Sequence, residues 1–343
     1  MNMQSPGPEA PDPEAEHSRI PRLEALHSET LSPIALRPGV VRLPSPVEEL
    51  DDERFARHGV RVLLKRDDLV SPVLPGNKWR KLKYNLVDAA ASGKSTILTF
   101  GGAFSNHVRA TAAAGALFGF TTIGVIRGEE HLPLNWSLSA AAAHGMRLTY
   151  LDRSTYRRKH EPDVLADLRA RFGDFFLLPE GGSNPAGVRG CAEILAEILD
   201  EVESPFDIAA CGCGSGGTLA GIAASLRPGQ RAIGFSALKG GRFLQDVVGD
   251  LQRATFGHAT DNWRIECDFH FGGFARRPPD LQRFIDDFAE RHSIALEPVY
   301  VAKMMYGLLE LTRRGTITPG STVLAVITGP DEHPRAASHP VRA

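Results

Sequence analysis

Short apolar runs alternate with Gly-rich turns and Ala-rich stretches along most of the chain. One such unit is STILTFGG, from Ser95, followed by NHVRATAAAGALFGF, and the next is TTIGVIRG, from Thr121, followed by LNWSLSAAAAHG. The order repeats in MRLTYLD, in DFFLLPEGGSN with PAGVRGCAEILAEILDEV, in FDIAACGCGSGG with TLAGIAASL, and in RAIGFSAL. Short β-rich runs that alternate with helices predict a doubly wound, largely parallel α/β fold. Ligands of such folds bind at the carboxyl ends of the strands, which here are the Gly-rich turns.

The stretch GVRGCAEILAEILDEV supports the helical part of this pattern. Its apolar residues lie three or four positions apart: Val188, Cys191, Ile194, Leu195 and Ile198. This spacing places them on one face of a helix. We therefore expect a helix that buries this face in the core.

Composition narrows the class of protein. A chain of 343 residues corresponds to about two domains. Its 39 Lys and Arg residues against 41 Asp and Glu residues give a net charge of -2, which argues against a general nucleic-acid binder. Four cysteines are too few for a secreted disulfide scaffold. The lack of a long apolar run or a secretory signal predicts a cytoplasmic protein that does not span a membrane. The Pro-rich ends, 1–19 and 331–343, are expected to be disordered tails.

The turn GCGSGGT, from Gly212 to Thr218, is a candidate phosphate cup. It follows an apolar run and opens a helix, so its glycines allow close backbone approach and its free N–H groups attract an anion. Ser215 and Thr218 add hydroxyl donors. A dinucleotide site also needs an acid about 20 residues later, but Ala237, Leu238 and Lys239 occupy that place. A tight turn without a ligand remains the alternative.

The turn PGNKWRKLKYN places Lys78 at the start of a predicted helix. A cation is unfavourable at a helix N-terminus, so the pKa of this lysine should fall. The neutral amine is the form that makes a Schiff base. The alternative is a surface lysine within a basic run that also contains Arg80, Lys81 and Lys83.

The turn GGAFSNH, from Gly101 to His107, is a candidate carboxylate site. Its backbone N–H groups, Ser105 and Asn106 are suited to an anion, although Ser105 is equally suited to be a helix N-cap. The serine lacks the G-x-S-x-G context of a hydrolase nucleophile. No metal site is expected, because Cys211 and Cys213 lie within the phosphate turn and the histidines show no paired spacing.

Together these turns resemble one family. The strings KRDDLVSPVLPGNKWRKLKYNL, TFGGAFSNH, PEGGSN, CGSGGTLAG and EPVY occur in this order, as in the 1-aminocyclopropane-1-carboxylate deaminase/D-cysteine desulfhydrase group. The resemblance covers about 31–330 and implies pyridoxal 5'-phosphate as cofactor and the tryptophan synthase β-like fold (fold type II). It also implies two doubly wound α/β domains, a large one of 20–84 and 179–330 and a small inserted one of 85–178, and a homodimer.

The resemblance also implies residue roles. Lys78 would hold the cofactor and move the proton at the substrate α-carbon. Asn106 would hydrogen-bond the 3′-oxygen of the cofactor, and Ser105 with Asn106 and His107 would hold the substrate carboxylate. Ser105 would also assist proton transfer as a catalytic residue. Tyr300 would face the substrate. The phosphate cup would consist of Gly214, Ser215, Gly216, Gly217 and Thr218.

Two positions separate the branches of this family. The deaminases carry a glutamate, paired with the pyridine nitrogen, where this chain has Val301. Thr328 matches the hydroxyl residue that contacts this nitrogen in the desulfhydrase branch. A neutral hydroxyl leaves the cofactor a weaker electron sink, which suits β-elimination better than ring opening.

Two aromatic positions depart from the family. Phe274, a candidate substrate contact, replaces a tyrosine, and Phe104 stands where relatives often carry a hydroxyl-bearing aromatic. Both changes suggest a less polar substrate.

The sequence thus predicts a lyase or deaminase that converts a small amino acid into a 2-oxo acid and ammonia, with D-cysteine as first candidate. One alternative is a 1-aminocyclopropane-1-carboxylate deaminase. Another is a pyridoxal-phosphate-binding protein with little turnover, suggested by Phe274 and Val301. A nicotinamide-dependent oxidoreductase is disfavoured because the ribose-binding acid is missing.

Overall fold

The computed structural model describes residues 41–74, 76–199 and 206–329. These residues all belong to one compact unit. The two predicted tails, 1–19 and 331–343, lie outside the described residues. Within the described ranges no helix is both long and apolar enough to cross a membrane.

The first sheet has six strands in the order β1-β2-β10-β7-β8-β9. The strands are β1 (Val47–Glu49), β2 (Arg61–Lys65), β7 (Ile208–Cys213), β8 (Arg231–Ser236), β9 (Trp263–Glu266) and β10 (Thr322–Val326). All pairs are parallel except β1 with β2, which is antiparallel. The predicted parallel architecture is confirmed, while the antiparallel edge strand had no signal in the pattern.

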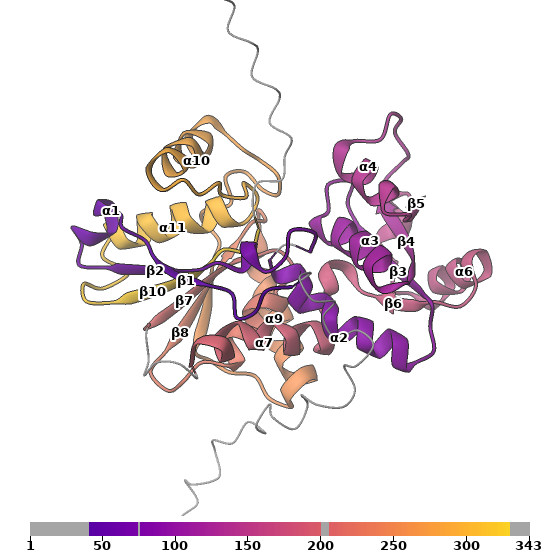
Figure 1. Ribbon diagram of the computed structural model, residues 1–343, viewed down its shortest axis with the longest axis horizontal. Coiled ribbons are helices and arrows are strands. Elements are labelled where there is room, and N and C mark those ends of the chain that lie inside the picture. The colour runs from indigo at the N-terminus through magenta and orange to yellow at the C-terminus, as the bar shows by residue number, and fades with distance from the viewer. Residues whose placement is uncertain (1–40, 75, 200–205, 330–343) are drawn as a thin grey trace, which may run out of the picture. The chain divides into compact units, whose positions relative to one another are not determined.

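Helices cover both faces of this sheet (Figure 1). The bounds are α1 (Glu53–Ala56), α10 (Pro279–His292) and α11 (Val301–Arg313) on one face, and α7 (Pro185–Leu199), α8 (Gly217–Ala224) and α9 (Leu244–Phe256) on the other. The face predicted from the apolar spacing in α7 is buried in the core. Burying apolar surface stabilises such a packing by about 25 cal/mol per Å².

The second sheet has four parallel strands in the order β5-β4-β3-β6. Its strands are β3 (Thr96–Gly101), β4 (Thr121–Arg127), β5 (Arg147–Leu151) and β6 (Phe176–Leu178). Its helices are α3 (Asn106–Phe118) and α4 (Trp136–Ala143) on one face and α5 (Arg153–Arg157) and α6 (Pro162–Phe172) on the other. The four strands lie within 85–178, and the domain boundaries themselves stay a prediction.

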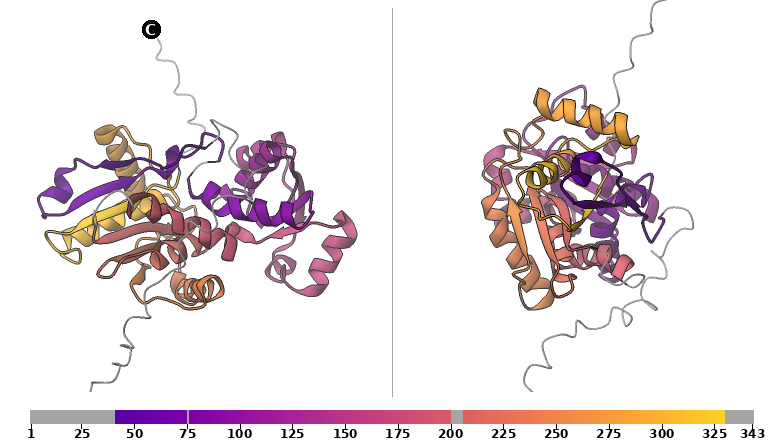
Figure 2. Two further views of the ribbon diagram at one scale, coloured as in Figure 1. Left: turned by 60° about the horizontal axis from the view of Figure 1, so that its bottom comes forward. Right: turned by 90° about the vertical axis from the view of Figure 1, so that its left-hand side faces the viewer.

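Helix α2 (Asn77–Ala91) lies between the two sheets (Figures 1 and 2). It packs so closely on α7 that a Cβ on Gly190 would lie 1.9 Å from the carbonyl oxygen of Arg80. Only glycine fits this crossing. Three short helices complete the described fold: η3 (Asp67–Leu69), η4 (Glu180–Gly182) and η5 (Gly241–Phe243).

A buried ion network fixes the start of α2. The Arg80 side chain is 0% exposed and contacts Asp67 at 2.9 and 3.0 Å and Glu197 at 2.5 and 3.0 Å. Lys65 donates to the same Glu197 carboxylate at 2.7 Å. Because Arg80 and Lys81 are both buried, the interpretation of this basic run as a surface feature is wrong.

Candidate active site

A cavity of about 1390 Å³ opens where the carboxyl ends of strands from both sheets come together. Three segments of its lining are Gly102–Asn106 after β3, Gly214–Gly216 after β7, and Thr328 after β10. Every site residue predicted from the sequence lines this cavity except Gly217, which lies directly behind Gly216 in the same turn. Segments far apart in the chain are thus brought to one place.

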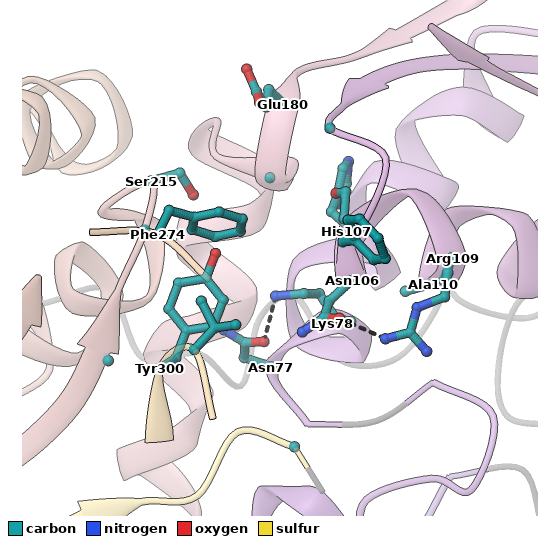
Figure 3. A pocket seen from close by; sticks show the side chains of 18 of the residues that line it. Asn77, Lys78, Asn106, His107, Arg109, Ala110, Glu180, Ser215, Phe274 and Tyr300 are labelled. Carbon is teal, nitrogen blue, oxygen red and sulfur yellow. Dashed lines mark hydrogen bonds between the residues drawn. The ribbon is translucent and has the colours of Figure 1, made fainter. Parts of the chain in front are cut away.

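Lys78 is the second residue of α2 and reaches into the space between Tyr300 and Asn106 (Figure 3). Its Nζ donates to Oδ1 of Asn77 at 2.9 Å. Burial, reinforced by the nearby Lys81, lowers the pKa of Lys78 to about 7. A large share of this amine is therefore neutral and nucleophilic near neutral pH.

The neighbouring Asn77 connects this lysine to the glycine turn. Its Nδ2 donates to Oγ1 of Thr218 at 2.9 Å. The proton of the Thr218 hydroxyl is then free for an acceptor in the cavity. Sequence reasoning missed Asn77, although it precedes the predicted lysine in the same string.

Lys81 lies on the same side of α2, beside the glycine turn. Its Nζ donates to the carbonyl of Gly181 and to the hydroxyl of Ser183, both at 3.1 Å, and to the hydroxyl of Ser215 at 3.3 Å. The residue is only 3% exposed, and burial lowers its pKa. No carboxylate within the described ranges pairs with it, so its charge is available for an anion.

Glycines keep the cup open. A Cβ on Gly217 would lie 2.8 Å from Oγ of Ser183 and 3.3 Å from Nζ of Lys81. A Cβ on Gly214 would lie 2.8 Å from the Tyr300 ring. Gly216 has φ of 78° and is the N-cap of α8, so the backbone N–H groups at the start of that helix face the cup.

The loop after β3 forms the opposite side. The Ser105 hydroxyl caps α3 by accepting from the N–H of Val108 at 3.3 Å, so the N-cap alternative describes this residue correctly. Asn106 Oδ1 accepts from Arg109 at 2.6 Å. Its Nδ2 is then the group left to donate to an oxygen in the cavity.

His107 lies behind this loop with a defined tautomer. The hydroxyl of Thr99 donates to the carbonyl of Leu178 at 3.0 Å and lies 2.8 Å from Nε2 of His107. Since a hydroxyl has one proton, Nε2 of His107 must be the donor of the second bond. Burial, with Lys78 and Lys81 nearby, lowers the pKa of His107 well below its usual value, so the ring is neutral.

Tyr300 is the N-cap of α11, with its ring against the glycine turn. Its backbone N–H donates to Oε2 of Glu297 at 2.7 Å, and the same carboxylate also accepts from the N–H groups of Val299 and Val301. Burial raises the pKa of Tyr300, so its hydroxyl stays protonated. Glu297 lines the cavity and was missed, although it begins the quoted string EPVY.

Comparison with known proteins identifies the family. The model of the pyridoxal-phosphate dependent enzyme family matches residues 42–329. The chain belongs to this family.

A protein of Pyrococcus furiosus with a provisional name as a 1-aminocyclopropane-1-carboxylate deaminase is 31% identical over 91% of this chain and 92% of its own length. A D-cysteine desulfhydrase of Klebsiella pneumoniae is 27% identical over 91% of this chain and 94% of its own length. A solved structure described as an ACC deaminase homologue superposes with a TM-score of 0.75 at 28% identity, over 88% of this chain and 95% of that one.

The protein is therefore a pyridoxal-phosphate-dependent enzyme with the tryptophan synthase β-like fold (fold type II). The donor set described above fits this cofactor: a lysine amine for its aldehyde, and a buried ammonium with hydroxyl and backbone donors for its phosphate. We expect Lys81, which the sequence analysis treated only as part of a basic run, to be the cation for the phosphate.

Of the two positions that separate the branches of the family, Thr328 and Val301, only the first lines the cavity. Val301, the first residue of α11, is buried in the apolar core. Phe274 and Phe104 line the mouth and are 44% and 51% exposed. The Phe274 ring stands edge-on to Tyr300 at a centroid distance of 6.0 Å.

Proposed function

We propose that this enzyme catalyses α,β-elimination or deamination of a small amino acid, giving a 2-oxo acid and ammonia. D-cysteine is the first substrate to test, and 1-aminocyclopropane-1-carboxylate is the second. The observation that carries the proposal is the Lys78 amine, with a pKa lowered to about 7, between Tyr300 and the carboxylate-binding loop.

Each side chain then has a distinct task. When bound, pyridoxal phosphate withdraws electrons from the α-carbon of the amino acid. The Lys78 amine takes the α-proton, because it is neutral near pH 7. Ser105 and the N–H groups at the start of α3 hold the substrate carboxylate. The Tyr300 hydroxyl, kept protonated by burial, donates a hydrogen bond to the departing group.

Elimination is favoured over ring opening by the environment of the expected pyridine position. Thr328 provides a neutral hydroxyl at the cavity wall, whereas Val301 is apolar and lies in the core without lining the cavity. An uncharged partner does not enforce a protonated ring. Elimination expels its leaving group from the β-carbon at once and depends less on a strong electron sink.

A second candidate, a cofactor-binding protein with little turnover, rests on Phe274. A tyrosine hydroxyl at this position is replaced by an apolar ring at the mouth of the cavity. Loss of one general acid–base group typically lowers a rate by about 10²–10⁴-fold. Turnover within the normal range of enzymes would remove this candidate.

The test uses the cofactor-loaded enzyme with D- and L-cysteine and with 1-aminocyclopropane-1-carboxylate. Sulfide and pyruvate report elimination, and 2-oxobutanoate reports ring opening. Lys78→Ala should lose the visible absorbance of the bound cofactor and all turnover. Lys83→Ala is the matched control, since Lys83 pairs with Glu193 away from the cavity. Turnover by Lys78→Ala would refute the assigned role.

We also propose that the enzyme acts as a homodimer in the cytoplasm. The support for the homodimer is the resemblance to its family. Sedimentation equilibrium of the full chain measures the first point. A mass near twice 37.2 kDa is the expected result.

A further inference from the structure

The cavity continues beyond Lys78 along the carboxyl edge of the second sheet. Arg127 is the last residue of β4, and Arg153 begins α5 directly after β5; both line the cavity. In the register of the sheet Gly101 of β3 pairs with Ile126, and Arg127 pairs with Leu151. Neighbouring strands lie about 4.8 Å apart. The backbone of Arg127 thus lies one strand away from the start of the carboxylate-binding loop, and Arg153 lies one strand further.

The acids at the cavity wall already have partners. Glu297 accepts from three backbone N–H groups of α11 and the turn before it. Glu180 pairs with Lys159 at 3.3 Å. Within the described ranges no carboxylate lies within 4 Å of the guanidinium of Arg127 or of Arg153 (hereafter the arginine pair).

The proposed reaction does not use this charge. In the proposed reaction Lys81 and the glycine turn bind the phosphate of the cofactor, and the loop of Ser105 binds the substrate carboxylate. A substrate with a neutral side chain leaves the arginine pair without an anion. Solvated arginines are ordinary on outer helices, but these two occupy the strand ends where α/β folds bind ligands. The lining also includes Arg276 and Arg277, two and three residues after Phe274.

We propose that the substrate is an amino acid whose side chain carries an anionic group, such as a phosphate monoester, a sulfate ester or a sulfonic acid, and that the arginine pair binds this group. The proposal rests on the proposed function and specifies its substrate class. It replaces the expectation of a less polar substrate, which rested on Phe104 and Phe274. Those rings lie at the mouth, whereas Arg127 and Arg153 stand at the ends of β4 and β5. A guanidinium group can bind an oxyanion with two parallel hydrogen bonds.

The reaction balances for O-phosphoserine. Lys78 takes the α-proton, the electron pair of that bond forms the Cα–Cβ double bond, and the Cβ–O bond breaks with its electrons leaving on phosphate. Water then hydrolyses the resulting enamine to pyruvate and ammonia. No oxidant or reductant is needed.

The kinetic test compares both enantiomers of O-phosphoserine with O-acetylserine, whose side chain is uncharged before elimination. We expect kcat/KM to be at least about 10-fold higher for one O-phosphoserine enantiomer than for O-acetylserine. The gain should come chiefly from a lower KM, because one or two charge-assisted hydrogen bonds hold the phosphate. Arg127→Gln should lower the ratio of the two kcat/KM values by roughly 10- to 100-fold. Arg157→Gln is the control. It also removes one positive charge, but Arg157 lies on α5 and does not line the cavity.

A binding test gives a readout without turnover. The probe is 2-amino-3-phosphonopropanoate, whose C–P bond does not break in this reaction, followed by calorimetry on the loaded enzyme. It should bind at least about 10-fold more tightly than 2-aminobutanoate, and Arg127→Gln should remove most of this difference. Equal binding of the two probes, or inorganic phosphate binding as tightly as the amino acid, would overturn the proposal.

The two proposals fail in different ways. If the enzyme turns over D-cysteine or O-acetylserine but discriminates against the phosphorylated substrate, the substrate class is wrong and the reaction type stands. If Arg127→Gln and Arg157→Gln change the substrate ratio equally, the arginine pair is not the binding site. If Lys78→Ala retains turnover, the proposed function itself is wrong.

Discussion

The two walls of the cavity are built in opposite ways. In the cofactor wall, formed by Asn77, Lys81 and Gly214–Thr218, the side chains of Asn77, Lys81 and Thr218 are buried, and hydrogen bonds join α2 to the glycine turn. The substrate wall, formed by Arg127 and Arg153 at the ends of β4 and β5, is exposed to solvent. A preorganised wall suits a ligand of fixed shape, here the cofactor. An open charged wall suits a ligand that differs from one relative to another, here the substrate.

The cofactor wall is also anchored from behind. Arg80 lies two residues after Lys78 on α2, and its guanidinium holds both Asp67, next to β2, and Glu197 on α7. The substrate wall has no such network among the described residues. We therefore expect equal substitutions on the two walls to have very unequal effects on stability.

Arg80→Met should lower the free energy of unfolding by about 3–5 kcal/mol, because it leaves the buried Asp67 carboxylate without its cation and leaves Glu197 with Lys65 alone. Arg153→Met, the same change on the substrate wall, should stay within about 0.5 kcal/mol of the parent. Urea unfolding of the cofactor-free chain measures both values. Equal losses in the two variants would refute the contrast between the walls.

The lowered pKa of Lys78 gives the next largest effect. Amine reagents attack the neutral form, so labelling rises as pH increases through the pKa of the group. With a pKa of about 7 instead of 10.5, Lys78 should label at pH 7 about a thousand-fold faster than an ordinary lysine of equal access. Peptide mass mapping of the cofactor-free protein from pH 5 to about pH 10 measures this, with a short lysine peptide as reference. A half-point near that of the peptide would contradict the burial argument.

The sequence predicted the local features of this molecule well. Alternating runs and glycine turns gave the parallel α/β architecture, and each of the three turns lies at the cavity. The fall in the pKa of Lys78 was also predicted in direction. Its cause differs, since burial and Lys81 dominate over the position at the start of α2.

Long-range relations could not be predicted in the same way. Lys81 resembles its neighbours in a basic run, and only the fold places it beside Ser183 and Ser215, which are 102 and 134 residues away. Arg127 and Arg153 lie in separate strand–helix units, and they stand at one edge of the sheet only because β4 and β5 are adjacent in it. Neither relation has a periodicity or a spacing that a single sequence displays.

The last prediction tests whether the cofactor wall depends on that long-range placement. Lys81→Met keeps the length of the side chain but removes the ammonium that contacts Ser183 and Ser215. A charge-assisted contact to phosphate contributes about 1.5–3 kcal/mol, so the affinity for pyridoxal phosphate should fall roughly 10- to 100-fold. Lys83→Met is the matched control, because Lys83 pairs with Glu193 on the other side of α2. Absorbance titration of the cofactor-free proteins measures both dissociation constants. If the two variants lose affinity equally, general charge steers the cofactor; if Lys81→Met alone loses it, the buried ammonium is the phosphate ligand of this wall.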